Sequence, residues 1–148
     1  MKPHQRILAA GLMTAMLVLG WPLPGDTEEN PGTVDLVLPQ EALTAPELVA
    51  LFSDKTVYSV TAVDGRESVS YYAPSGDLRQ RRHGITRSGR WRVTANHRIC
   101  LQMEDLPEKC RIVVKEQGVY RKYIVKKNGK HQHSVSYIKF EEGNPLGL

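Results

Sequence analysis

Arginines concentrate in one short region of the chain and are the strongest candidates for chemistry at a site. Guanidinium groups hold phosphate or carboxylate through paired hydrogen bonds, so such a cluster predicts an anion-binding face. The alternative is that these charges simply keep the outer face of a sheet in water. The candidate residues, expected on adjacent strands, are Arg79, Arg81, Arg90, Arg92 and Arg98.

The chain contains two cysteines, Cys100 and Cys110, which allow one intramolecular pairing. A metal site would need further ligands at suitable spacing, and a catalytic thiol would need an unpaired cysteine. We therefore expect a structural disulfide between them.

Other reactive side chains form weaker patterns. His131 and His133 alternate and would offer two metal ligands on one strand face, but they also read as solvated residues that follow the Asn128-Gly129 turn. The sequence contains no Gly-x-Ser-x-Gly, His-Glu-x-x-His or phosphate-loop motif. We assign no metal, no cofactor and no catalytic residue.

The N-terminus has the pattern of an export signal. A basic start (Lys2, His4, Arg6) precedes an apolar run, Ile7 to Gly20, that is too short for a comfortable membrane span. We expect residues 1–25 to be a signal peptide, which places the protein in the periplasm or outside the cell with no membrane span after cleavage. A disulfide fits such an oxidising compartment. An uncleaved N-terminal anchor is the alternative.

The remaining chain has the length of one domain. Residues 26–42 predict a flexible linker, and residues 43–148 predict a small β-barrel-like domain. The full chain carries a net charge of +4, with acidic residues towards the front and basic residues towards the back. Nucleic acid is a poor partner for an exported protein.

One helix is predicted after the linker. Thr44 and Glu47 form a capping box with Pro46 in the first turn, and Leu48 and Phe52 follow on one face. Two turns are too few for an isolated helix, so it must pack on one end or edge of a sheet.

The rest of the chain alternates with period two between tight turns, among them Asp64-Gly65, Ser88-Gly89 and Asn128-Gly129. This pattern predicts an all-β fold with a minor helical part: about eight antiparallel strands in a meander, as a small up-and-down barrel or a curled sheet. The expected strands are 56–62, 68–73, 78–85, 90–95, 97–103, 110–116, 119–126 and 134–140.

A filled interior is expected, because the inward positions carry modest bulk. The proposed inward residues are Val57, Val69, Tyr71, Trp91, Val93, Ile99, Leu101, Ile112, Val114, Tyr123 and Val125. The expected disulfide conflicts with this assignment. Cys110 shares a strand face with Ile112 and Val114. Cys100 lies on the face opposite to Ile99 and Leu101. Either a bulge near Arg111 or burial on two sides must lie between Cys100 and Val114.

Several short motifs occur in a characteristic order. They are Leu43 with Glu47-Leu48 and Leu51-Phe52, Tyr71-Tyr72-Ala73-Pro74-x-Gly76-x-Leu78-Arg79, Gly89-x-Trp91-x-Val93, Cys100, Cys110 and Gly143-Asn144-Pro145. Over residues 43–145 the chain resembles a domain-of-unknown-function family of small exported bacterial proteins. The resemblance implies an exported setting and a β-rich fold, and it implies no catalytic residues.

Two functions follow as hypotheses. The first is an exported binding or interaction module of the cell envelope that contacts an envelope polyanion or an acidic protein through its arginine-rich face. The second is a small hydrolase or isomerase whose site lies in the mouth of the barrel.

Overall fold

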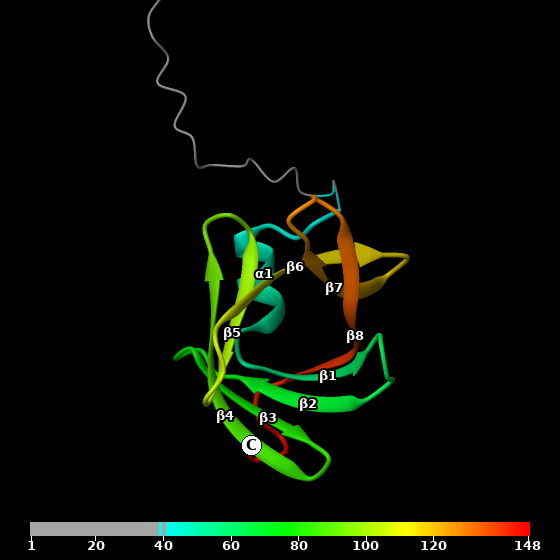
Figure 1. The fold of residues 1–148 in the computed structure, drawn as a ribbon. Helices are drawn as coiled ribbons and strands as arrows, with labels where there is room; N and C mark the ends of the chain where they lie inside the picture. The colour runs from blue at the N-terminus through cyan, green and yellow to red at the C-terminus, as the bar shows by residue number, and fades with distance from the viewer. Residues whose placement is uncertain (1–38, 40) are drawn as a thin grey trace, which may run out of the picture. The chain divides into compact units, whose positions relative to one another are not determined.

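The computed structural model describes Pro39 and residues 41–148. The expected signal peptide and most of the expected linker lie outside these residues. One helix, α1 (Ala45–Phe52), precedes eight strands (Figure 1). The strands are β1 (Lys55–Thr61), β2 (Glu67–Tyr72), β3 (Asp77–Arg82), β4 (Ile85–Thr94), β5 (Arg98–Met103), β6 (Lys109–Glu116), β7 (Val119–Val125) and β8 (His131–Glu142).

The strands form a closed antiparallel barrel in chain order. Each strand pairs with the next, and β8 pairs back with β1, where Val57 lies opposite Phe140. The predicted all-β class with one short helix is confirmed, as a closed barrel. Closure pairs both edges of the meander, which an open sheet of this length would leave exposed.

Tight turns connect the strands largely where glycines predict them. Gly65 and Gly129 have φ values of 64° and 76° in the β1–β2 and β7–β8 turns. Ser88 and Gly89 differ from expectation, because they lie within β4 and not in a turn. A Cβ atom at Gly89 would come within 2.5 Å of the carbonyl oxygen of Gln102, so this glycine permits close approach of β5.

Helix α1 begins at the predicted capping box. The Thr44 backbone N–H and hydroxyl donate to the Glu47 carboxylate at 2.8 and 2.7 Å. The backbone N–H of Ala45 donates to Nδ1 of His97 at 2.9 Å, which ties the start of the helix to the β4–β5 turn.

The buried face of α1 packs into one end of the barrel, and Figure 1 shows the helix inside the ring of strands. The Phe52 ring lies 5.0 Å from Tyr72, 5.2 Å from Tyr137 and 5.7 Å from Phe140, measured between ring centroids. Trp91 extends this aromatic cluster through Tyr72. The helix therefore fills one half of the interior.

The strand faces differ from the expected assignment on three strands. Val57, Trp91, Val93, Ile99 and Leu101 belong to the core or pack against it, as expected. On β2 the buried residues are Ser68, Ser70 and Tyr72, so Val69 and Tyr71 face outward. Val113 belongs to the core in place of Ile112 and Val114, and Lys122 and Ile124 line the interior in place of Tyr123 and Val125.

Two-sided burial resolves the conflict around the disulfide. Cys100 lies opposite Cys110 and Ile99 opposite Arg111 in a regular register, so no bulge is needed between β5 and β6. Ile112, Val113 and Val114 are 0%, 0% and 2% exposed, so both faces of β6 are covered. Ala42, at the end of the expected linker, forms a bridge with Val114 beside this strand.

Among the described residues, no helix is long and apolar enough to cross a membrane.

We expect Phe52→Ala to lower the free energy of unfolding by about 3–5 kcal/mol, because the truncation leaves a cavity among three aromatic rings. Urea denaturation measures the change. Val49→Ala on the same helix is the matched control, because Val49 is 47% exposed and surface truncations stay within about 0.5 kcal/mol. Equal urea midpoints for the two variants would show that α1 does not support the barrel.

Candidate functional site

A cavity of about 330 Å³ opens at the end of the barrel opposite α1, and we call it the lumen cavity. Its walls come from the ends of β1, β3, β5 and β7, from the starts of β6 and β8, and from the β5–β6 loop. The lining residues are Thr61, Gln80, Arg82, Ile99, Leu101, Met103, Leu106, Pro107, Lys109, Arg111, Lys122, Ile124, Ser134 and Val135.

Four of these side chains are cationic: Arg82, Lys109, Arg111 and Lys122. No acidic side chain of the described residues lines the cavity, and none forms an ion pair with any of the four. The Nε of Arg82 is buried and has no hydrogen-bond partner among the residues that the structure describes. The cavity therefore carries a concentrated positive charge that the described residues do not neutralise.

Strand alternation places each cation in the lumen. Arg82 follows the buried Leu78 by four residues on β3, so the two side chains share a face. Arg111 precedes the core residue Val113 by two residues on β6. Lys122 lies opposite Val135 on β8 and directs its Nζ over the ring of Tyr137, 5.9 Å from the centroid.

Burial and mutual repulsion act on these groups. Loss of water around Lys122, followed by the charges of Arg111 and Arg82, lowers the pKa of Lys122 to about 8. Burial also lowers the pKa of Arg111, and the nearby Arg98 adds to the effect. The cavity therefore combines space for a ligand with cations that a bound anion would stabilise.

The arginines predicted from the sequence lie elsewhere, on the outer face of β3, β4 and β5. The outward alternation is clear on β4, where Arg90 and Arg92 flank the inward Trp91. Arg79 donates to the Ser88 hydroxyl across the strand pair. Arg81 lies opposite Thr86, and Arg98 opposite Thr94.

Carboxylates already neutralise part of this outer set. Arg92 donates to both carboxylate oxygens of Glu108, at 2.7 and 2.6 Å. Arg90 pairs with Asp77 at 3.6 Å. An outer groove of about 560 Å³ is lined by Arg90, Arg92 and Glu108 together, so its charge is mixed.

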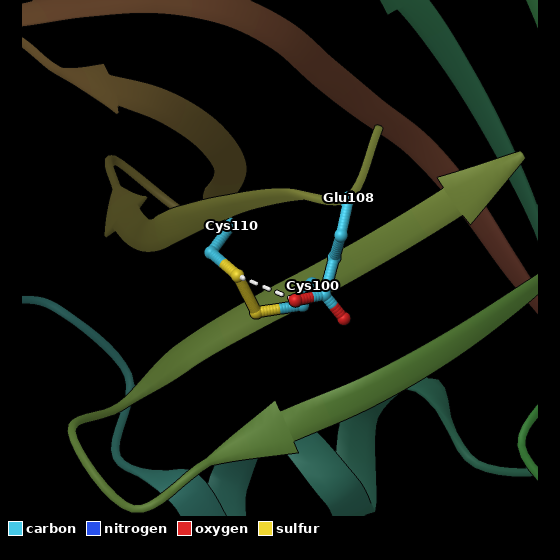
Figure 2. A group of neighbouring side chains, drawn as sticks. All are labelled: Cys100, Glu108 and Cys110. Atoms are coloured by element: carbon cyan, nitrogen blue, oxygen red, sulfur yellow. Dashed lines mark hydrogen bonds between the residues drawn. A yellow bond between two sulfur atoms is a disulfide. The ribbon is translucent and has the colours of Figure 1, made fainter. Parts of the chain in front are cut away.

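The disulfide between Cys100 and Cys110 is present and joins directly opposed residues of β5 and β6. Figure 2 shows Glu108 beside it, with Oε2 3.7 Å from the Sγ of Cys110. These three residues form a cluster with metal-ligand spacing, but both sulfurs are committed to the disulfide and neither is a thiolate ligand. The bond instead closes the short loop that carries Leu106 and Pro107 to the rim of the lumen cavity.

The two histidines considered as metal ligands have other surroundings. The Nε2 of His133 lies 3.1 Å from the hydroxyl of Ser136, and its ring lies 5.5 Å from that of Tyr123. His131 is exposed at the start of β8. Within the described part of the chain, neither belongs to a group of three metal-ligating side chains.

The anion-binding residues predicted from the sequence did not include Arg82, Arg111 or Lys122. The missed signal on β7 is the alternation of its side chains. Tyr120, Lys122 and Ile124 share one strand face, although Tyr123 and Val125 on the other face look more apolar. The register shift between β7 and β8 at Lys122 and Tyr123 places its extra residue, Ser134, on β8, so the alternation of β7 itself is regular.

No family model, curated protein or solved structure matches this chain.

We expect the variant that replaces Cys100 and Cys110 with serine to be about 2–3 kcal/mol less stable, because the disulfide restricts the unfolded chain. Urea denaturation measures the loss, and the far-UV circular dichroism of the folded protein should keep its β-type shape. A reducing agent should destabilise the wild type and leave the double variant unchanged. If reduction did not move the wild-type midpoint, the disulfide would have no structural role.

The lowered pKa of Lys122 predicts a pH-dependent stability. Between about pH 8 and pH 9.5 the folded protein loses the Lys122 proton while the unfolded chain keeps it, so the unfolded state binds more protons and stability rises with pH. Lys122→Met should abolish the rise, and Lys126→Met, at an exposed lysine, should retain it. Chemical denaturation below pH 10 avoids the pH range in which the buried tyrosines Tyr72 and Tyr137 would contribute, because burial raises their pKa values in the folded protein. A rise of equal size in the Lys122→Met variant would place its origin elsewhere.

Proposed function

We propose that this protein is a small ligand-binding barrel that holds an anion in the lumen cavity. The observation that carries the proposal is the convergence of Arg82, Arg111 and Lys122 on one interior space without an acidic neighbour among the described residues. The cavity volume of about 330 Å³ falls at the lower end of the range for small-molecule sites, roughly 300–1,000 Å³.

The energetics of the empty cavity support an anionic ligand. Burial removes water from Lys122 and Arg111, and folding has already met that free-energy cost. A bound carboxylate or phosphate gains charge-assisted hydrogen bonds from groups that are held in place by strands. Little ordering is needed on binding, which favours affinity.

The outer arginine face is a weaker candidate for the same chemistry. Glu108 and Asp77 compete with any ligand for Arg92 and Arg90. Exposed cations are also screened by water and salt, so each contributes less than a buried one.

An enzyme is the less favoured alternative. Thr61 and Ser134 are the hydroxyl side chains of the described cavity lining, and both already donate hydrogen bonds, to Asp64 and to the carbonyl oxygen of Lys122. No histidine or carboxylate of the described residues lines the cavity to activate them.

The proposal includes an exported setting, periplasmic or secreted. The basic and apolar pattern of residues 1–25 and the disulfide support it. Ligands would then be anions available outside the cytoplasm.

We expect acetate and inorganic phosphate to shift the backbone amide signals of β3, β6 and β7 around the cavity in saturable NMR titrations of the full chain. The double variant Arg111→Met, Lys122→Met should weaken binding about tenfold or more, because each removes a charged hydrogen-bond donor. Lys122→Met alone is the milder variant, and Lys126→Met is the control for loss of one charge.

The double variant Arg90→Met, Arg92→Met separates the two faces. If it abolishes the shifts while the lumen variants retain them, the outer face binds the anion and the lumen proposal is wrong. If neither anion produces saturable shifts near the cavity, the proposed function is wrong.

A further inference from the structure

Apolar side chains make up much of the wall of the lumen cavity, and they are not distributed evenly. Three successive inward positions of β5, Ile99, Leu101 and Met103, form an apolar strip from the core to the rim. Leu106 and Pro107 continue it in the β5–β6 loop, and Ile124 faces the cavity near the end of β7. A small inorganic anion would leave this strip in contact with water.

The cationic groups lie deeper than the apolar rim. Arg111 pairs with Ile99, which is fully buried, and the next inward residue beyond Arg111 is the core residue Val113. Lys122 lies over Tyr137, whose ring contacts Phe52 of α1 at the floor of the cavity. Arg82, at the end of β3, lines the same cavity, and its Nε is buried.

The rim has a different character. Met103 is the last residue of β5, and Leu106 is 46% exposed in the loop that follows. Lys109 also lies at the rim and is exposed, so its charge stays in water. Arg111 and Lys122 thus lie towards the floor of the cavity, whereas Met103, Leu106 and the solvated Lys109 lie at its rim.

We propose that the natural ligand is an amphiphilic monoanion, a carboxylate with a short unbranched apolar chain, bound with its head at Arg111 and Lys122 and its chain along Met103 and Leu106. This inference rests on the proposed function and adds the class and orientation of the ligand. The guanidinium groups match the planar, two-oxygen geometry of a carboxylate. The apolar strip then contributes through burial of the chain.

The size of the cavity limits the chain. At about 30 Å³ per water-sized group, about 330 Å³ holds on the order of ten non-hydrogen atoms. Octanoate has that size, and a longer acyl chain would extend past Leu106 into solvent.

The test compares octanoate, acetate and octanol on the full chain with its disulfide intact, by calorimetry and NMR. Octanoate should bind at least roughly a hundredfold more tightly than acetate, because each buried methylene contributes about fourfold. Octanol should bind at least about tenfold more weakly than octanoate, because it cannot pair with the cations. Nuclear Overhauser effects from the terminal methyl group of octanoate should reach Met103 and Leu106.

Two substitutions at exposed apolar residues, which lie outside the packed core, provide a test of the rim and its matched control. Leu106→Ser should weaken octanoate several-fold and leave acetate unchanged, and Val63→Ser, at a residue that is 83% exposed in the β1–β2 turn, should change neither. The control separates loss of the apolar wall from a general change in surface polarity.

Each failure has a distinct meaning. If octanoate and acetate bind the cavity equally, or the terminal methyl group contacts Tyr137, the amphiphile inference is wrong and the anion-binding function stands. If octanol binds as tightly as octanoate and Lys122→Met has no effect on either, the proposed anion-binding function is wrong as well.

Discussion

The packing of Phe52 against Tyr72, Tyr137 and Phe140 is the interaction on which the rest of the structure depends. The pairing of β1 with β8 closes the sheet and creates an interior that must be filled. Helix α1 fills it at one end, where the aromatic side chains meet in a dense core. At the other end the interior remains open, because the strands there carry Gln80, Arg82, Arg111 and Lys122 at inward positions. The division of one barrel into a packed half and an open half therefore follows from the placement of a two-turn helix.

The cationic side chains on the two faces of the barrel wall differ in whether they have carboxylate partners. On the outside, Arg90 and Arg92 have carboxylate partners, as is common for solvated strand faces. Inside, the cations have no acidic partner among the described residues, although an unpaired charge costs most where water is scarce. A protein retains such a cost when the groups serve a purpose other than stability, and a bound anion would offset it.

The disulfide connects the structure to this cavity. It joins β5 and β6 at Cys100 and Cys110 and closes the loop whose Leu106 and Pro107 form part of the rim. Arg111 follows Cys110 directly, so the cross-link also fixes the strand that carries this half-buried cation. A covalent bond at this position limits changes in the shape of the cavity, which suits a preorganised binding site.

The sequence by itself determined the class of fold, since capping residues, turn glycines and period-two alternation act over a few neighbouring residues. It determined α1, the eight strands and the pairing of Cys100 with Cys110, and it left barrel and curled sheet open. Tertiary structure alone decided the closure and the inward faces of β2, β6 and β7. Ile112, Val113 and Val114 are buried consecutively, and on β7 Lys122 and Ile124 face the interior although Tyr123 and Val125 are the apolar residues of the other face. For that reason the sequence predicted anion binding on the outer face, whereas the unneutralised charge lies inside, where residues from β3, β6 and β7 meet only when the barrel closes.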